Sequence, residues 1–422
     1  MKKILIAGAG HGGLVVGAKL AKNGYDVHVF ERFCNDKLGY PWDDMMNRDT
    51  FDVAEIEYDI KDIILHPSVT MVPPSLKNEI KIEFPEDKAN FEIERKVLYR
   101  YLIENAKKHG VNMHFEHECE LMLNENNKVS GLKVNGQEVF GDLVIDASGG
   151  NSKILNALPT SYNIKYNFTE KSQFFTYRGR FEVDETKEIN FKNSFAMYLL
   201  FNGIRGISWF KIVDGLADVL IGSIDPINEE MVEKTLNEMK KAQPSFTKNL
   251  KTGGQFNTIP FGPPIENFIG DNYVAIGDSA CMATPINGSG ISNSIYAAKI
   301  LADVIMCADA KNENRQGYTV AELYNYQKEF MLKYGAKMHE IACLKDFLLA
   351  LDPRDISFIF EKQLISEDEL NAAMFGKDVK LTLPEMLKRG AKGISNIKLL
   401  LNLSKTLNKS KAAAEKAAKP YK

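Results

Sequence analysis

The stretch Ile4-Leu5-Ile6-Ala7-Gly8-Ala9-Gly10-His11-Gly12-Gly13 stands near the start of the chain and decides its fold. Its four apolar residues predict a buried strand, the glycines predict a tight turn, and the periodic run Leu14–Lys22 predicts a helix. Gly8 permits the turn, Gly10 lets the backbone approach a pyrophosphate, and Gly13 lets helix and strand pack closely. The free N–H groups at the helix start can then receive phosphates.

The residues that follow strengthen this interpretation. A second strand is predicted at Asp26–Phe30 and closes on Glu31, eighteen positions after Gly13. There a carboxylate can hydrogen-bond both hydroxyls of an adenosine ribose. Strand, glycine loop, helix and acid in this order predict a bound dinucleotide, against the alternative of a glycine turn without a ligand. The predicted contacts are Gly8, Gly10, His11, Gly12, Gly13, Glu31 and Arg32.

A second motif lies far downstream. A short strand, Asn272–Ile276, leads into Gly277-Asp278, a turn at Pro285–Gly290 and a long helix, Ile291–Met306. This resembles the second flavin motif of the glutathione-reductase-like flavoproteins, in the branch that contains p-hydroxybenzoate hydroxylase and the geranylgeranyl reductases. The resemblance implies that FAD is the dinucleotide, and that the helix start faces the flavin N1/O2 edge and stabilises the reduced anion. The contacts that it implies are Gly277, Asp278, Pro285, Gly288, Gly290 and Ile291.

Two further positions refine the resemblance. Family members carry an arginine at the place of Arg95, near the phosphate or ribose of the cofactor, although a solvated charge at a helix start is the alternative. Hydroxylases of the branch usually have Asp-Gly where this chain has Ser148-Gly149, and their aspartate helps to hold FAD and a visiting NADPH. This departure counts against a hydroxylase-type encounter with NADPH. A positive or donating His11 would help to bind the phosphates, but many residues suit a helix start.

Three residues are candidates for catalysis. The segment Gly39–Asp44 follows soon after the second strand, where family members place residues against the isoalloxazine ring. It offers an aromatic wall, and either Asp43 or Asp44 can supply or take a proton if burial raises its pKa. Trp209 matches an aromatic position in the lipid-contacting stretch of geranylgeranyl reductases, and we expect it to stack on a ligand. The alternatives are a surface turn for the aspartates and core packing for Trp209.

Composition excludes several classes of protein. The 422 residues are 44% hydrophobic, as in an ordinary soluble chain, and no run of eighteen apolar residues predicts a membrane span. Five scattered cysteines without a C-x-x-C pair predict reduced thiols in a cytoplasm and no iron–sulfur cluster. The seven histidines lack metal-ligand spacing, so we expect no metal site.

The predicted fold is α/β: a discontinuous Rossmann-type FAD-binding domain, an antiparallel-sheet substrate domain and a helical C-terminal region. The cofactor domain is expected at residues 1–35, 88–158 and 254–310, with an insertion near the flavin at 36–87. The substrate domain is expected at 159–253, and the helical region with its basic tail at 311–422. Strands are predicted at Phe174–Phe181, Phe195–Phe201, Gly206–Ile212 and Ala217–Ser223, and a helix at Glu229–Lys241. Hairpin turns are predicted at Asn124–Asn127 and Asn135-Gly136, and a capping box at Ser366 and Glu369.

Charge is distributed unevenly. The segment Lys388–Lys422 holds ten Lys/Arg and one Glu, a balance of +9, so the remaining chain carries −3 − 9 = −12. Ile394, Ile397 and Leu401 fall near one helical face within it. Such a helix can lie on an anionic membrane surface, here the inner face of a cytoplasmic membrane. The alternative is a helix docked on its own domain with a disordered Ala/Lys-rich tail. Nucleic acid is not expected, because the body is acidic.

These features favour an FAD-dependent oxidoreductase that reduces a carbon–carbon double bond of an apolar, isoprenoid or lipid-like substrate. The first alternative is a single-component NAD(P)H-dependent flavin monooxygenase. The second is a non-catalytic FAD-binding sensor at a membrane surface. Only one glycine fingerprint is present, so the electron donor is external: a ferredoxin, a flavodoxin or a transient NAD(P)H.

Overall fold

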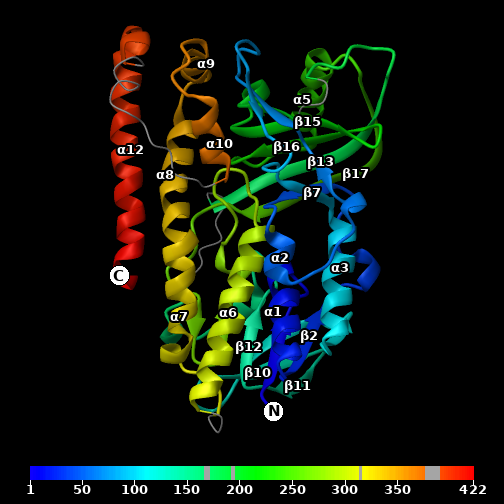
Figure 1. The fold of residues 1–422 in the computed structure, drawn as a ribbon, viewed down its shortest axis with the longest axis vertical. Coiled ribbons are helices and arrows are strands. Elements are labelled where there is room, and N and C mark those ends of the chain that lie inside the picture. The colour runs from blue at the N-terminus through cyan, green and yellow to red at the C-terminus, as the bar shows by residue number, and fades with distance from the viewer. Residues whose placement is uncertain (166–171, 192–194, 313–315, 376–389) are drawn as a thin grey trace.

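The computed structural model describes residues 1–165, 172–191, 195–312, 316–375 and 390–422 (Figure 1). Its first sheet has six strands, namely β1 (Lys3–Ala7), β2 (Asp26–Glu31), β8 (Asn112–Phe115), β12 (Leu143–Asp146), β18 (Ile269–Gly270) and β19 (Tyr273–Ala275). They lie in the order β18-β19-β12-β1-β2-β8, and every neighbouring pair is parallel except β18 with β19. The two predicted motifs, far apart in the chain, therefore share one sheet.

Helices α1 (His11–Lys22) and α6 (Ile291–Lys311) run side by side along this sheet, and α3 (Arg95–Lys108) packs on α1 (Figure 1). A Cβ on Gly12 would lie 2.9 Å from the carbonyl oxygen of Ser294 in α6, so this glycine lets the two helices touch. Gly8 has a φ of +91°, and a Cβ there would lie 2.6 Å from the Ala147 carbonyl oxygen. The turn after β1 thus lies against the end of β12, where ligands of such sheets bind.

Seven strands form the second sheet, which crosses the upper part of Figure 1. They are β5 (Ser68–Val72), β6 (Ile80–Glu83), β13 (Gln173–Val183), β14 (Phe195–Leu199), β15 (Gly206–Val213), β16 (Leu216–Ser223) and β17 (Phe246–Pro260). Their order is β17-β13-β16-β15-β14-β5-β6. Helix α5 (Glu229–Ala242) packs on this sheet through Val232, Leu236 and Met239. The strands and the helix predicted between residues 159 and 253 are confirmed, each to within two positions at its ends.

The segment 36–87 contains more regular structure than its turn-rich sequence suggests. Its strands β5 and β6 complete the second sheet, where β5 is parallel to β14. Strands β3 (Asp43–Met46) and β4 (Ile64–Leu65) pair with β7 (Phe91–Glu94) in a small separate sheet, and α2 (Thr50–Ala54) follows β3. Such short strands hold too few residues for periodicity to reveal them. At the other end, β17 crosses position 254, so the second sheet extends to Pro260.

A separate three-stranded antiparallel meander lies beside the first sheet. It consists of β9 (Cys119–Leu123), β10 (Val129–Val134) and β11 (Gln137–Phe140). Both predicted hairpin turns are present, and Asn135 and Gly136 adopt the positive φ values, 46° and 83°, that a tight hairpin turn requires.

Helices dominate the C-terminal region, as predicted. They are α7 (Val320–Phe330), a π-helical turn (Met331–Gly335), α8 (Ala336–Ala350), α9 (Pro353–Glu361), α10 (Glu367–Phe375) and α12 (Ile397–Ala418). The capping box forms, since the Ser366 amide donates to Glu369 at 2.8 Å. Helix α6 is long and apolar enough to cross a membrane by length and composition, but 72% of its apolar window is buried, as in a core helix.

The basic segment docks on the rest of the chain. Helix α12 lies along α8 (Figure 1) and buries Leu399 and Ser410. The disordered tail that formed part of one alternative is not observed, because α12 continues to Ala418 and the Tyr421 hydroxyl receives a hydrogen bond from Gln327 at 2.9 Å. Burial of the tyrosine ring anchors the end of the chain. Lys388 and Arg389, the first two charges of the segment, lie outside the described residues.

Candidate functional site

A cavity of about 340 Å³ lies between the second sheet, β3 and the first turn of α6. One part of its wall is apolar and includes Phe174, Phe195 and Ile259, and another part carries charged side chains. The structure therefore brings together residues that the sequence places far apart. The predicted site residues that line the cavity are Asp43, Asp44, Arg95, Trp209, Asp278, Gly288, Gly290 and Ile291.

The N-termini of α1 and α6 are both suited to negative charge. Their N-cap residues are Gly10 and Gly290, and neither helix has a side-chain cap or an acidic residue in its first turn. The unsatisfied N–H groups and the helix dipole favour an anion at such an end. The turn before α6 aims it at the cavity: Gly288 has a φ of +71° and donates its amide to Thr284, while Pro285 is buried behind this turn.

Glu31 lies beside the glycine loop. Its carboxylate accepts the Ala9 amide at 2.9 Å and the Phe33 amide at 2.9 Å, and the residue is buried. Each oxygen keeps a further lone pair for a ligand hydroxyl. Arg32 differs, because it is exposed, lies with its guanidinium 4.7 Å from the centre of the Phe33 ring, and does not line the cavity. The structure brings Glu31 to the loop and leaves Arg32 at the surface.

His11 begins α1 and packs against Tyr99, with 4.9 Å between the ring centres. Burial, assisted by the nearby Arg95 charge, lowers the pKa of His11 to about 3. A positive His11, one of the two forms considered from the sequence, is therefore excluded at neutral pH. Its Nε2 atom is buried without a hydrogen-bond partner. The neutral ring fills space between the glycine loop and α3.

Asp278 lies at the cavity end of the second motif. Burial raises its pKa, although the nearby Arg95 charge opposes the rise. Gly290 lies next to this carboxylate, since a Cβ there would be in van der Waals contact with Asp278 Oδ1 at 3.4 Å. Gly277, with a φ of +68°, makes the turn that presents Asp278. A buried carboxylate of this kind gains most from ligand hydroxyl groups that donate hydrogen bonds to it.

The predicted Asp44 and Arg95 meet in a charged network. Arg95 Nε donates to Asp44 Oδ2 at 2.6 Å, and Arg178 Nη1 donates to Asp44 Oδ1 at 2.9 Å. Burial alone would raise the pKa of Asp44, but the two arginines hold it below its ordinary value. Asp44 therefore remains ionised and positions two cations. Arg95 is not the solvated helix-start charge that was the alternative.

Arg178 occupies the centre of this network. Its guanidinium lies 5.1 Å from the Trp42 ring centre and 5.0 Å from that of Trp209, so it sits between two indole faces. It also donates to Asp218 from Nε at 2.9 Å and from Nη2 at 2.6 Å. Trp209 thus packs on a cation and on Phe195, edge to face at 5.3 Å, while part of it lines the cavity. The expected ligand stacking by Trp209 stays a prediction.

Most of this ionic network was not predicted from the sequence. In register across three strands, Lys211 of β15 faces Asp218 of β16, which faces Arg180 of β13. Lys211 Nζ contacts Glu92 directly and lies 3.4 Å from Asp218, and Arg180 forms an ion pair with Asp43. Charged residues inside apolar strands were the available signal, because a buried charge requires a partner.

Asp43 differs from its neighbour Asp44 in its electrostatics. Burial raises the pKa of Asp43 even though Lys211, Arg180 and Arg178 oppose the rise. The main-chain carbonyl of Asp43 accepts a hydrogen bond from Arg178 at 2.5 Å, which fixes the backbone. Of the two carboxyl groups that the sequence left open as proton donors, Asp43 is the one whose pKa is raised by its surroundings.

The segment after β3 ties this wall to α6. The Asn47 amide donates to Ser292 Oγ at 2.8 Å, and Asn47 Nδ2 donates to the Tyr296 hydroxyl at 2.9 Å. Tyr296 in turn donates to Asp49 at 2.5 Å. These contacts join the first turns of α6 to the strand that carries Asp43. They hold the two sides of the cavity at a fixed spacing.

Ser148, which stands where hydroxylases of the branch usually have an aspartate, hydrogen-bonds to the buried carboxylate of Asp146. Asp146 is fully buried and accepts hydrogen bonds from Ser148 Oγ at 2.6 Å, Ser152 Oγ at 2.5 Å and the Tyr273 hydroxyl at 3.0 Å. Ser148 therefore serves to satisfy a buried carboxylate at the end of β12. Within the described ranges, no group of three or more His, Cys, Asp or Glu is arranged to hold a metal ion.

Comparison with known proteins gives two family matches and a consistent set of relatives. Residues 6–36 match the NAD(P)-binding Rossmann-like domain, and residues 76–174 match the tryptophan halogenase family. A digeranylgeranylglycerophospholipid reductase from Methanothrix thermoacetophila is 25% identical over 395 residues, which cover 86% of this chain and 92% of that protein.

Solved structures share the fold. A geranylgeranyl bacteriochlorophyll reductase-like protein from Thermoplasma acidophilum superposes with a TM-score of 0.73 at 19% identity, covering 94% of this chain and 99% of that one. A flavin-dependent brominase superposes with a TM-score of 0.66 at 18% identity, covering 94% and 99%. These findings confirm the predicted resemblance to geranylgeranyl reductases and the predicted Rossmann-type α/β fold.

Proposed function

We propose that this chain is an FAD-dependent oxidoreductase that reduces a carbon–carbon double bond of an apolar, isoprenoid or lipid-like substrate. The observation that carries the proposal is the cavity where Asp43, Trp209 and Asp278 meet the start of α6 at Ile291. A flavin-edge helix, an acid whose pKa is raised by burial and an aromatic wall are the parts that such a reduction needs. Relatives named as reductases over most of the chain support it.

The residues present fit FAD. Two helix starts without side-chain caps would receive its pyrophosphate and the flavin N1/O2 edge. The remaining lone pairs of Glu31 and the buried carboxylate of Asp278 would accept hydroxyl hydrogens from its sugar portions. In the proposed site, the cofactor contacts are Gly8, Gly10, His11, Gly12, Gly13, Glu31, Arg95, Gly277, Asp278, Pro285, Gly288, Gly290 and Ile291, and the exposed Arg32 is left out.

When bound, FAD supplies the hydride that one alkene carbon receives. The chain supplies the proton for the other carbon, and Asp43 is the proposed donor because burial raises its pKa. Asp44 remains ionised and holds Arg95 and Arg178 in place. The apolar wall of Phe174, Phe195 and Ile259 keeps water away from the substrate. The electron donor is proposed to be external, a ferredoxin, a flavodoxin or a nicotinamide.

A flavin monooxygenase remains the second candidate, and the match of residues 76–174 to the tryptophan halogenase family favours it. The non-catalytic sensor gains no support from the site.

The experiment that separates these three functions uses purified protein loaded with FAD, reduced without oxygen and mixed with an isoprenoid alcohol such as geranylgeraniol or with air. Oxidation of the flavin by the alkene with a reduced product supports the reductase, and a C4a-hydroperoxide absorbance after mixing with air supports the monooxygenase. Failure of both supports the sensor.

Cofactor loading has its own readout. The chain contains two tryptophans, Trp42 and Trp209, and both line the cavity. Titration of the cofactor-free protein with FAD is therefore expected to quench more than half of the intrinsic fluorescence, because both indoles lie beside the proposed flavin. Unchanged fluorescence at saturating FAD would place the cofactor elsewhere.

We also propose contact with an anionic membrane surface through α12. Ile394 in the turn before α12, and Ile397 and Leu401 in α12, are 70%, 56% and 54% exposed, beside the exposed Lys398 and Lys405. Each lysine near an anionic surface contributes about 1 kcal/mol, and the apolar side chains add to this.

Vesicle binding tests this contact. The protein is expected to sediment with vesicles of phosphatidylglycerol and to stay in solution with phosphatidylcholine alone. The double variant Ile397→Ser, Leu401→Ser should lose about tenfold in affinity, the equivalent of about 1.4 kcal/mol. The control Ile60→Ser removes another apolar side chain, 60% exposed, from outside the basic segment. Equal binding of all three proteins would contradict the contact.

A further inference from the structure

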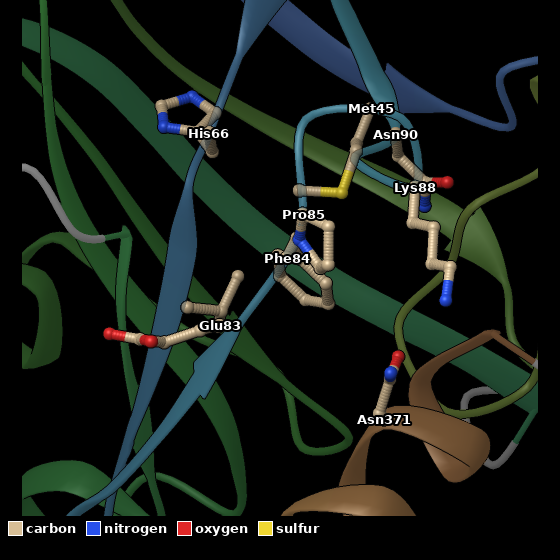
Figure 2. A pocket seen from close by; sticks show the side chains of 9 residues that line it. Met45, His66, Glu83, Phe84, Pro85, Lys88, Asn90 and Asn371 are labelled. Atoms are coloured by element: carbon tan, nitrogen blue, oxygen red, sulfur yellow. The ribbon is translucent and has the colours of Figure 1, made fainter.

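A second, smaller cavity adjoins the main one. It has a volume of about 90 Å³ and lies between the β5–β6 hairpin, the loop before β7 and α10. Figure 2 shows His66 at one end of it, with Met45 and Asn90 on the opposite side. Met45 and Asn90 also line the main cavity, so these two residues form a shared wall. The smaller cavity therefore places polar side chains directly beside the wall of the main cavity.

Three neighbouring titratable groups lie between the two cavities. His66, on the wall of the side cavity, has its Nε2 within ion-pair distance of Glu92 of β7, although neither of the two facing atoms makes a hydrogen bond. Glu92 contacts Lys211 Nζ through its other carboxylate oxygen. Both Glu92 and Lys211 are about 2% exposed at their side chains and line the main cavity, together with Asp43. The mechanism above leaves these three groups, His66, Glu92 and Lys211, unused.

The proposed reduction requires a supply of protons to Asp43, which the three titratable groups His66, Glu92 and Lys211 can provide. Each turnover transfers one proton from Asp43 to substrate carbon and leaves a carboxylate in a wall shielded by aromatic side chains. A buried acid that acts repeatedly must regain its proton without admitting water to the reacting carbons. We propose that His66, Glu92 and Lys211 form a proton path from the side cavity to the wall beside Asp43. This proposal rests on the proposed function for its purpose.

The proton balance is simple. The Lys211 ammonium releases a proton toward the Asp43 carboxylate, across the main cavity that both residues line, and becomes an amine. His66 first gains a proton on one ring nitrogen from water in the side cavity and then releases the proton of its other nitrogen to Glu92, which passes it to that amine. Net transfer is one proton from solvent to Asp43, and no bond other than those to hydrogen changes. Burial, assisted by the Lys211 charge, lowers the pKa of His66 to about 4, so the imidazole is neutral and able to both accept and donate.

The path is tested during turnover. Reduced, FAD-loaded protein is mixed with geranylgeraniol without oxygen, and the uptake of the proton that Asp43 regains is followed with a pH-indicator dye. We expect His66→Ala and Glu92→Gln to slow this uptake by about tenfold or more, within the range that proton-transfer groups contribute. His109→Ala, at the end of α3, is the matched histidine control and should behave as the wild type. Equal uptake rates in all four proteins would overturn the path.

Rescue separates a proton carrier from a structural residue. Imidazole added to His66→Ala should restore the rate at which geranylgeraniol oxidises the reduced flavin, because the free base replaces the missing ring in the side cavity. The fluorescence of Trp42 and Trp209 serves as the check that the main cavity is intact. A slow variant that imidazole does not restore would overturn the path. If geranylgeraniol does not oxidise the reduced flavin of the wild type, the proposed reductase function falls; if it does and the variants take up protons as fast as the wild type, the path alone falls.

Discussion

Replacement of Asp43 by asparagine is expected to slow alkene reduction by about 10²- to 10⁴-fold, the usual contribution of a positioned general acid. Asparagine still accepts a hydrogen bond from Arg180 but has no proton to give. The effect should appear in the rate of flavin oxidation by geranylgeraniol, measured in a stopped-flow instrument without oxygen. Flavin binding, measured by tryptophan quenching, should change little.

The pH dependence gives the prediction a sign. Burial raises the pKa of Asp43, so the wild-type rate should fall as pH rises through that pKa and the acid is lost. The Asp43→Asn variant should lack this fall. Asp44→Asn is the matched comparison, because its carboxylate binds Arg95 and Arg178 and its pKa is below the ordinary value. It should weaken FAD binding and leave the pH profile in place. Equal profiles in the wild type and Asp43→Asn would remove Asp43 as the donor.

The cofactor half of the site was predictable because its physics is local. Gly8 must adopt a positive φ, α1 and α6 must begin at glycines, and a carboxylate must end β2, and each demand leaves a mark within a few residues. The second sheet was predictable for a similar reason, since β15 and β16 are long enough to show alternation. The short strand β3 was not, although the segment around Asp43 and Asp44 was identified from its position in the chain.

The ionic network could not be predicted from the sequence, because it depends on the register in which the strands of the second sheet pair. Lys211, Asp218 and Arg180 face one another across three strands, and a shift of one residue would send each to the other face. The position of Arg178 depends on the Trp42 and Trp209 rings, because its guanidinium packs on both of them. Pairing of this kind is set by tertiary packing, and no local pattern encodes it.

Removal of the Asp218 carboxylate tests whether this network also holds the second sheet together. Asp218 is fully buried and accepts two hydrogen bonds from Arg178. The ammonium group of Lys211 lies nearby, 3.4 Å from its carboxylate. Breaking a buried pair leaves an uncompensated charge, which typically costs 3–5 kcal/mol, so we expect Asp218→Asn to lower the free energy of unfolding by about 3 kcal/mol at pH 7. Urea unfolding followed by tryptophan fluorescence measures this, and both indoles lie beside the network.

The same carboxylate predicts a particular acid sensitivity. Although its burial acts in the opposite direction, Arg178 and Lys211 lower the pKa of Asp218 to about 2 in the folded protein, below its ordinary value of 3.8. A group with a depressed folded pKa contributes stability above its unfolded pKa and loses it as pH falls toward the folded one. Wild-type stability should therefore decline by roughly 2 kcal/mol on this account between about pH 4 and pH 2, and Asp218→Asn should lack that part of the decline.

The chain offers a matched control in Arg205 and Asp225, a bidentate pair whose side chains are 52% and 43% exposed. Solvent screens such a pair, so Asp225→Asn should cost less than about 1 kcal/mol and leave the acid profile unchanged. Asp218 and Asp225 each receive two hydrogen bonds from one arginine but differ in burial and in the Lys211 charge beside Asp218, so the difference between the two variants measures what burial and this second cation add to the pair. If Asp218→Asn proved no more destabilising than Asp225→Asn, the network would contribute to the site alone and the sheet would depend on its apolar packing.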